Sequence, residues 1–377
     1  MALSLPLSFR LGAFYFAFFA YAGLWVAYFP PYLSARGLSA AEMAWILALP
    51  QAARVAAPAL WGWIADRSGA QRAIVVLGCL ANATCYALLP EVSGTAAMAW
   101  LVGTTALIST AALPLVEAIT LGALSGHTGR YGPIRLWGSI SFMAAVFAGG
   151  AWLDFSAPRA LPYAMLGFAL LAVAAALRLP PARVHTSPPQ PWSIRGPASA
   201  LLASGFCMAV AHGALYAFLT LHLQQLGYGG AAIGALWMLG VLAEIAVFFY
   251  LPQLFRRYAL STLLVASAAC ATLRFLAIGW AAQWLALLVV AQLLHAATFG
   301  SFHAAAVATV GRVFPPHAHA FGQTLFSSVG YGAGAAAGTV LAGWAWEAGG
   351  AGAAFSLSAL AALAGLVFAY ALKRAGL

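Results

Sequence analysis

The sequence predicts an all-α membrane protein with twelve transmembrane helices, arranged as two pseudo-symmetric six-helix bundles. Of its 377 residues, 64% are hydrophobic and only 6% are charged, whereas soluble domains carry about 25% charged residues. Apolar stretches recur along the whole chain, and each has the roughly 20 residues that a bilayer requires. A proline-rich segment near the middle separates six of these stretches from the other six. Lipid must therefore be the solvent for most of the surface.

The apolar stretches give the expected spans in order. In the first bundle we expect spans at residues 9–33, 40–65, 71–90, 94–123, 133–154 and 158–178. In the second bundle we expect them at 197–226, 230–253, 259–279, 283–312, 319–346 and 350–373. Residues 179–196 are rich in proline and arginine, so we interpret them as a cytoplasmic linker between bundles at 1–178 and 197–377.

The basic residues of the loops predict the orientation. With the amino terminus inside, the cytoplasmic segments hold thirteen of them: Arg10, Arg67, Arg72, Arg130, Arg135, Arg178, Arg183, Arg195, Arg256, Arg257, Arg312, Lys373 and Arg374. The opposite side holds only Arg36 and Arg159. Because loops rich in Lys and Arg stay in the cytoplasm, we expect a multi-pass protein of the cell inner membrane with both termini cytoplasmic.

The two halves of the sequence repeat a spacing. Gly37 opens the second span and Gly227 opens the eighth, and each lies 17 residues before a charged residue, Arg54 or Glu244. The same offset of 190 residues places Asp66 and Arg67 on Arg256 and Arg257. This register indicates two structurally equivalent halves, as in transporters built from parallel repeats.

The loop between the second and third spans carries a motif. Residues 62–72 read GWIADRSGAQR, in which the key positions are Gly62, Asp66, Arg67, Gly69 and Arg72. Gly62 would let a neighbouring helix approach closely, and Asp66 could accept hydrogen bonds at a helix end or pair with an arginine. We therefore expect these five residues to form a conformational latch on the cytoplasmic side. The motif resembles the cytoplasmic signature of the major facilitator superfamily, G-x-x-x-D-R-x-G-x-x-[RK], although family members often have Arg directly after the second Gly.

A narrower resemblance covers nearly the whole chain. It rests on residues 132–139 (GPIRLWGS), 234–245 (GALWMLGVLAEI), 295–305 (HAATFGSFHAA) and 114–117 (PLVE). These segments resemble the phenylpropionate permease group, which is related to the lactose permease and nucleoside–proton symporter families. The resemblance implies the major facilitator fold and proton-coupled uptake of a small organic solute, with an aromatic carboxylate as the first candidate.

Several ionisable residues fall inside the expected spans. They are Arg54, Glu117, Glu244 and Arg274, together with His212, His295 and His303. A charged residue at the bilayer centre costs roughly 2.5–3.5 kcal/mol on insertion scales and is therefore usually functional. Because the signs balance, we expect the two acids and two arginines to pair around a central cavity; the alternative is structural pairing between helices.

The chemistry of each side chain suggests its role. Arginine stays protonated and matches a carboxylate with its planar fork, so Arg54 and Arg274 are the candidates for binding an anion. Shielding a carboxyl group from water favours its protonated form, which makes Glu244 the first candidate for the proton site and Glu117 the second. His295 is a candidate for both roles, and His303 and His212 are further proton candidates, each with a neutral, hydrogen-bonded histidine as the alternative. The remaining substrate-binding candidates are Trp237, Phe299 and Tyr216. Because His295, Phe299 and His303 follow helical spacing, we expect them to share one face of the tenth span.

Other classes of function fit the sequence less well. HExxH and GxSxG motifs are absent from the chain, so we expect no enzyme, metal or cofactor, and the basic charge is explained by loop orientation rather than by nucleic acid. The expected partners are a small-molecule substrate, protons and the lipid bilayer, and we expect a monomer. A nucleoside or sugar proton symporter and a proton-driven drug or metabolite exporter are the alternatives on the same fold.

Overall fold

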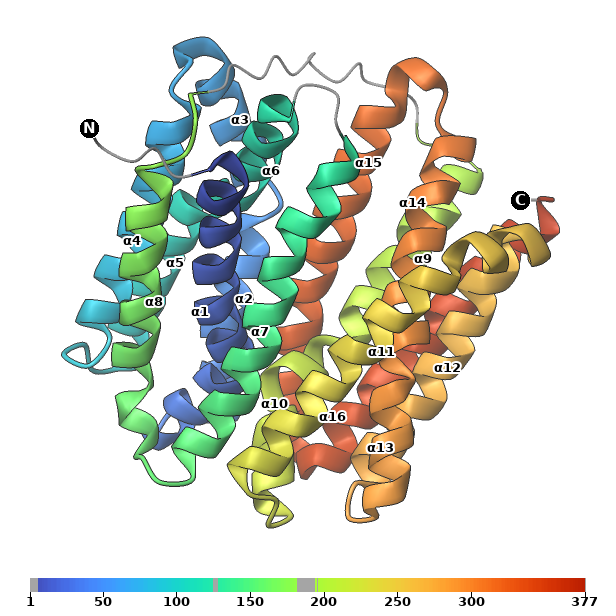
Figure 1. Cartoon of the computed structure of the whole chain (residues 1–377). Helices are drawn as coiled ribbons and strands as arrows, with labels where there is room; N and C mark the ends of the chain where they lie inside the picture. Colours follow the sequence, from blue (N-terminus) through green and yellow to red (C-terminus); the bar gives the residue numbers. More distant parts are fainter. Residues whose placement is uncertain (1–5, 125–127, 182–193, 195, 377) are drawn as a thin grey trace. The chain divides into compact units, whose positions relative to one another are not determined.

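A computed structural model of the chain describes residues 6–124, 128–181, 194 and 196–376. Nearly all of these residues are helical, and the described part of the chain contains no β-strand. Figure 1 follows the helices from the amino terminus in blue to the carboxyl terminus in red.

Among the residues that the structure describes, the first half of the chain forms eight α-helices. They are α1 (Leu7–Ala35), α2 (Ala40–Ala53), α3 (Ala57–Ser68), α4 (Gln71–Leu88), α5 (Thr95–Ser109), α6 (Ala112–Ala123), α7 (Tyr131–Leu153) and α8 (Leu161–Ala176). Short 3-10 turns precede α7 at Thr128–Arg130 and α8 at Pro158–Ala160.

The second half forms eight more α-helices and two π-helices. The α-helices are α9 (Pro197–Ala211), α10 (Gly213–Gln225), α11 (Gly230–Arg257), α12 (Leu260–Ala281), α13 (Leu285–Leu293), α14 (Phe302–Val313), α15 (His319–Ser327) and α16 (Ala335–Arg374). The π-helices are η3 (Ala296–Ser301) and η5 (Ser328–Gly334), and a 3-10 turn lies at Pro316–Ala318.

These helices account for twelve crossings of the membrane. Among the described residues, 11 helical stretches are long and apolar enough to cross a membrane. The last of them, Pro316–Arg374, has 59 residues, which at 1.5 Å per residue is about twice the length that one crossing needs. Gly349 and Gly350 leave the helical conformation within α16 (φ −161° and +63°), so this stretch turns back and crosses twice.

Four of the expected spans are broken rather than continuous. The span at 40–65 is interrupted after α2 at Arg54, and the span at 94–123 at Thr110 and Ala111. The span at 197–226 is interrupted at His212, and the span at 283–312 at Leu294. Prolines favour the first two breaks, because Pro58 and Pro114 have no N–H to donate and each lies in the first turn of the helix that follows, where that N–H would have no acceptor within the helix.

The described chain divides into two compact units. One contains Met1–Leu38, Ala56–Ser187 and Gly229–Gly234, and the other contains Ser39–Val55, Pro188–Tyr228 and Ala235–Leu377, in each case as far as these ranges are described. Two short segments, Ser39–Val55 and Gly229–Gly234, thus pack with the half of the chain to which they do not belong in sequence. The linker predicted at 179–196 stays a prediction, since residues 182–193 and 195 lie outside the described part.

Close contacts between helices hold each unit together. In the first unit α1 runs along α7, where the Tyr28 hydroxyl donates to the Val146 carbonyl oxygen over 2.5 Å. In the second unit α16 crosses the junction of α9 and α10, and a Cβ added at Gly213 would overlap the carbonyl group of Gly338. Without a hydrophobic force between helices in lipid, such close backbone packing is a main source of association.

The five predicted latch residues lie at the junction of α3 and α4. Gly69 has φ +66° and caps α3 by donating its N–H to the Ala65 carbonyl oxygen, so this position needs glycine. The Arg67 guanidinium lies 4.3 Å from the Trp63 ring centroid, and Arg72 donates to the Leu179 carbonyl oxygen over 3.5 Å. Within its own unit a Cβ at Gly62 meets no described atom within 4 Å, so the close helix approach expected there stays a prediction.

The Gly213 contact yields a stability prediction. We expect Gly213→Ala to lower the melting temperature of the detergent-purified protein, because the added methyl group overpacks a backbone crossing at a cost of about 1–3 kcal/mol. Gly167→Ala in α8 is the matched control, since a Cβ there meets no described atom within 4 Å. Equal melting temperatures for the two variants would contradict the close crossing.

Candidate functional site

The candidate site lies in the second compact unit and is built around helix breaks. Arg54 follows the last residue of α2, His212 separates α9 from α10, and His295 lies between α13 and η3. Tyr216 is in α10, Glu244 and Trp237 are in α11, Arg274 is in α12, and Phe299 is in η3. Broken membrane helices expose backbone groups and helix ends where a substrate or ion can bind, so this is the arrangement expected of a transport site.

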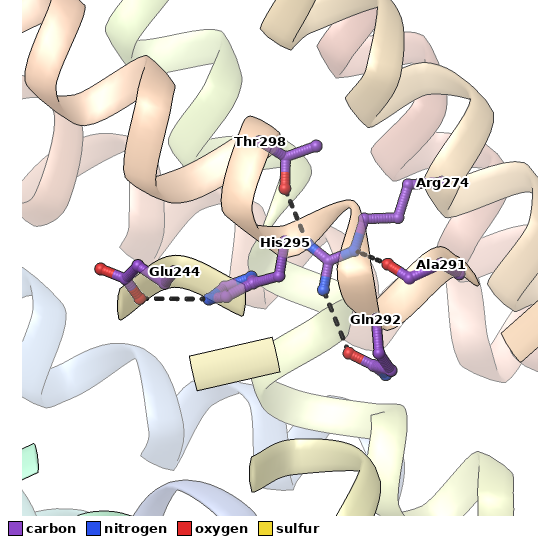
Figure 2. Close-up of polar contacts among 6 residues, drawn as sticks. All are labelled: Glu244, Arg274, Ala291, Gln292, His295 and Thr298. Carbon is purple, nitrogen blue, oxygen red and sulfur yellow. Dashed lines mark hydrogen bonds and ion pairs between the residues drawn. The ribbon is translucent and has the colours of Figure 1, made fainter. Parts of the chain in front are cut away.

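The Glu244 carboxyl group and the His295 imidazole lie next to each other within this site. The Glu244 Oε2 atom lies 3.7 Å from the His295 Nε2 atom, and both side chains are largely shielded from solvent. Figure 2 shows the His295 ring extending from its helix toward the Glu244 carboxylate. The distance exceeds that of a hydrogen bond, so a small movement of either side chain can make or break proton sharing between the two groups.

Arg274 is held by neutral groups. It is only 1% exposed, and its Nε donates to the Ala291 carbonyl oxygen over 2.8 Å. One terminal nitrogen donates to the Thr298 hydroxyl over 2.9 Å and the other to Gln292 Oε1 over 3.4 Å. In Figure 2 the guanidinium lies among these three groups, on the side of the helix break away from Glu244.

These contacts stabilise the helix break next to His295. Ala291 belongs to the last turn of α13, where carbonyl groups lack a partner in the helix and favour a positive charge. Thr298 belongs to the π-helix that follows. Arg274 thus joins both sides of the break, and its charge is fixed behind His295. Its predicted role in binding an anion stays a prediction.

Tyr216 contributes a ring to the candidate site close to its charged residues. The ring stacks on Trp237 with 6.2 Å between centroids, and the hydroxyl lies within electrostatic range of Glu244, Arg274 and Arg54. The side chain of Arg54 is exposed, so this guanidinium is accessible to an anion while Arg274 is not. The sequence placed Arg54, Tyr216 and Glu244 on three different spans, and the structure brings them together.

Three buried polar atoms at the site have no partner in the described structure. They are His212 Nε2, Gln292 Nε2 and His295 Nδ1. The His212 Nδ1 atom lies 2.8 Å from the Met208 carbonyl oxygen, and because a carbonyl can only accept, the ring proton must be on Nδ1. His212 therefore presents a lone pair and Gln292 presents an N–H donor. Leaving such groups unmatched costs about 1–3 kcal/mol each, so they are suited to bind a polar ligand or water.

A row of rings extends from His295. Phe299 stacks on His295 with 5.3 Å between centroids and on His303 with 6.4 Å. The Nδ1 atom of His303 lies 2.7 Å from the Tyr331 hydroxyl. The helical spacing of His295, Phe299 and His303 predicted this shared face, but Tyr331 in the π-helix η5 was not predicted. A tyrosine among many apolar residues gives no sequence signal for such a contact.

A separate ion pair lies in the first unit. Glu117 Oε1 is 3.7 Å from Arg135 Nε, and the Arg135 guanidinium lies 4.0 Å from the Phe19 ring centroid and 5.4 Å from that of Tyr15. We had placed Arg135 in a cytoplasmic loop. It lies instead in the second turn of α7, and the start of the apolar stretch at residue 133 was the signal that it belongs to the membrane helix.

Glu117 pairs with Arg135 rather than with Arg54 or Arg274, and Glu244 lies next to His295. Arg274 is bound to neutral groups, so the expected pairing of two acids with two arginines is wrong for Glu117 and Arg274, while a pair of Glu244 with Arg54 stays a prediction. The physical reason is that the break after α13 frees carbonyl groups near Arg274, and these satisfy its N–H donors without a carboxylate.

Comparison with known proteins gives a consistent result. The MFS_1 like family matches residues 8–357 of this chain. The probable 3-phenylpropionic acid transporter of Escherichia coli (strain K12) is 29% identical over 346 residues, which cover 88% of this chain and 89% of that protein. Maltose permease of Geobacillus stearothermophilus is 28% identical over 346 residues, which cover 89% and 86%.

Solved structures resemble the fold of the chain. The nucleoside transporter NupG has a TM-score of 0.83 at 19% identity, covering 98% of this chain and 99% of that one. A POT family transporter in complex with 5-aminolevulinic acid has a TM-score of 0.73 at 13% identity, covering 98% and 95%. At such identities the likeness establishes the fold alone, and it confirms the major facilitator fold predicted from the sequence.

The contacts of Arg274 yield a second prediction. We expect Arg274→Gln to lower the melting temperature in detergent, because each hydrogen bond that a buried charged group loses costs about 1.5–3 kcal/mol. Arg159→Gln, at an exposed arginine in the turn before α8, is the matched control and should leave it unchanged. A melting temperature equal to that of the unsubstituted protein would show that Arg274 does not fasten the break.

Proposed function

The chain belongs to the MFS_1 like family of membrane transporters, and we propose that it is a proton-coupled symporter. It imports a small aromatic carboxylate such as 3-phenylpropionate across the inner membrane by alternating access, with both termini in the cytoplasm. The observation that carries this proposal is the Glu244–His295 pair, which lies in the same compact unit as the exposed cation Arg54.

Glu244 and His295 are the proposed proton site. Either group can hold the proton, and the 3.7 Å separation lets the proton pass between them after a slight closure. The charge of Arg274, fixed next to the helix break that carries His295, repels a second positive charge on that ring, so Glu244 is the preferred holder of the proton in this proposal. Glu117 with Arg135 is the second candidate, in the first unit.

Arg54 is the proposed anchor for the substrate carboxylate. It lies at a helix break, directly after the last residue of α2, and its side chain is exposed to solvent. A guanidinium binds a carboxylate through two parallel hydrogen bonds. Tyr216, Trp237 and Phe299 offer ring faces nearby, which suits an aromatic acid whose other end is apolar.

Coupling follows from the charges of this site. A substrate anion alone would bring a negative charge next to Glu244, whereas a proton on Glu244 removes that repulsion. Proton and substrate therefore favour each other's binding and cross together. His212, His295 and Gln292 supply unmatched polar atoms that hold the polar parts of the substrate or its water.

The alternatives rest on weaker grounds. A nucleoside or sugar symporter is suggested by the relatives that carry such names, and a proton-driven exporter is compatible with the aromatic spans. Neither explains why an exposed arginine lies beside the proton site. These alternatives differ from the proposal in charge movement, and uptake measurements therefore separate them.

The third prediction concerns the proton. In liposomes, uptake of labelled 3-phenylpropionate should follow an imposed pH gradient and ignore voltage, because a monoanion carried with one proton moves no net charge. Glu244→Gln should reduce this uptake about tenfold or more, since the proton site no longer titrates. Glu91→Gln, at an exposed acid in the loop after α4, is the control.

Other outcomes of the same measurement have distinct meanings. Voltage-driven uptake of a nucleoside or galactoside, at about 2.3 kcal/mol per 100 mV and charge, would replace the substrate class. Intact pH-driven uptake by Glu244→Gln would refute Glu244 as the proton site. A lack of proton-dependent flux for all three solutes would favour the exporter.

The fourth prediction concerns the anion. Arg54→Gln should raise the KM for 3-phenylpropionate about tenfold to a hundredfold, the effect of losing a charged hydrogen-bonding partner. Arg257→Gln, at an exposed arginine in the last turn of α11, removes the same charge outside the site and should leave KM unchanged. An unaltered KM in Arg54→Gln would move the anion site elsewhere.

A further inference from the structure

A carboxylate at the end of α7 binds the beginning of α11. Asp154 follows the last residue of α7. Its Oδ1 atom accepts from the Gly230 amide over 2.5 Å, and its Oδ2 atom accepts from the Ala231 amide over 2.9 Å. These amides open α11, where the first N–H groups have no acceptor within the helix and carry a partial positive charge. One carboxylate therefore satisfies two of them.

A second carboxylate makes the same contact elsewhere. Glu347 in α16 lies just before the break at Gly349 and Gly350. Its Oε1 atom accepts from the Ala41 amide in the first turn of α2 over 2.9 Å, and it also forms a hydrogen bond with the Ser39 side chain.

Both carboxylates come four residues after a glycine that touches the same partner helix. A Cβ added at Gly150 would overlap the Gly230 carbonyl oxygen, and a Cβ added at Gly343 would overlap the Ala44 Cβ. Because residues four apart share a helix face, each glycine and its acid face one neighbour together. The sequence pattern at both junctions is G-x-x-x-[DE].

The two junctions are equivalent in the internal repeat. The 190-residue offset that relates the two halves places Ala40 and Ala41 on Gly230 and Ala231, the residues that the acids bind. Each junction joins a helix from one half of the sequence to a helix start from the other half. The bound helix starts open the two short segments, Ser39–Val55 and Gly229–Gly234, that pack with the opposite half of the chain. Two matched contacts of this kind indicate a shared function.

We infer that Asp154 and Glu347 are paired gating residues of the transport cycle. Their carboxylates hold the helix starts of α11 and α2 in one state, and both contacts separate in the other. The loop charges place these helix ends on the extracytoplasmic side, so the contacts close the path to the outside. The inference rests on the proposed alternating-access transport.

The composition of the chain supports this role. The chain has only 7 acidic residues in 377, and two of them occupy these junctions although both are exposed. An exposed carboxylate bound to a helix start contributes only a modest stabilising free energy. Water can replace it as the acceptor for the helix amides. A contact of this strength can open repeatedly, while the glycines fix where the helices meet when it closes.

The first test measures access from outside and needs no substrate. In a cysteine-free background, Ala52→Cys next to Arg54 reports access to the site through its reaction with a membrane-impermeant maleimide added to intact cells. Asp154→Ala combined with Glu347→Ala removes the acceptor oxygens and should increase the labelling rate about threefold or more, because loss of the two contacts favours the outward-open state. Glu91→Gln removes one acid from the same side and should leave the rate unchanged.

The second test holds the two carboxylate–helix contacts closed with engineered disulfide bonds. In the pairs Asp154→Cys with Ala231→Cys and Ala41→Cys with Glu347→Cys, oxidation should stop 3-phenylpropionate uptake and reduction should restore it, while the single variants are insensitive to oxidant. Unchanged labelling in the neutral double variant, or uptake that continues in a crosslinked protein, would overturn the gating role. If 3-phenylpropionate is not carried at all, the labelling test still decides, so failure of the gate and failure of the proposed substrate are distinguishable.

Discussion

The structure depends on one constraint: inside a bilayer, every backbone N–H and C=O group must find its partner within the protein. Continuous helices meet this requirement by themselves, whereas a broken helix leaves several groups without partners. This chain breaks four of its spans, and each break must be satisfied by something else. At the break before His295 the partner is Arg274, whose guanidinium donates hydrogen bonds to the Ala291 carbonyl oxygen and the Thr298 hydroxyl. A buried arginine is thus stable here because the helix is broken, and the break is stable because the arginine is there.

The same constraint explains where the chemistry lies. Arg54 and His212 also occupy breaks, where the backbone already departs from the regular helix and side chains are not packed on all sides. Polar atoms such as His212 Nε2 and Gln292 Nε2 are left unmatched only around these positions or near a chain turn, as far as the described residues show. A site of this kind combines a fixed positive charge, an accessible positive charge and a titratable pair in a small volume. It can therefore bind an anion and a proton in each other's presence, which is the requirement for coupled transport.

The helix ends at the loops obey the constraint in a different way. There water can satisfy free amides, so the contacts of the exposed Asp154 and Glu347 carboxylates can open without leaving a buried group unpaired. The contrast with Arg274 is physical: a buried contact that closes a helix break is permanent, and an exposed contact on a helix start is reversible. Glycine at positions 150 and 343 determines how closely the helices meet, while the acids four residues later stabilise the closed arrangement.

The sequence by itself determined the class of the protein, the number of crossings, the family signature and most of the residues that gather at the site. Composition and apolar length suffice for these, because the bilayer imposes them on any chain. The helical spacing of His295, Phe299 and His303 also predicted their shared face. Only the tertiary structure decided which groups pair: Arg135 with Glu117, His295 with Glu244, and Arg274 with neutral atoms. The reason is that pairing in a membrane protein depends on where helices break and how closely they cross, and both are set by contacts between residues far apart in the sequence.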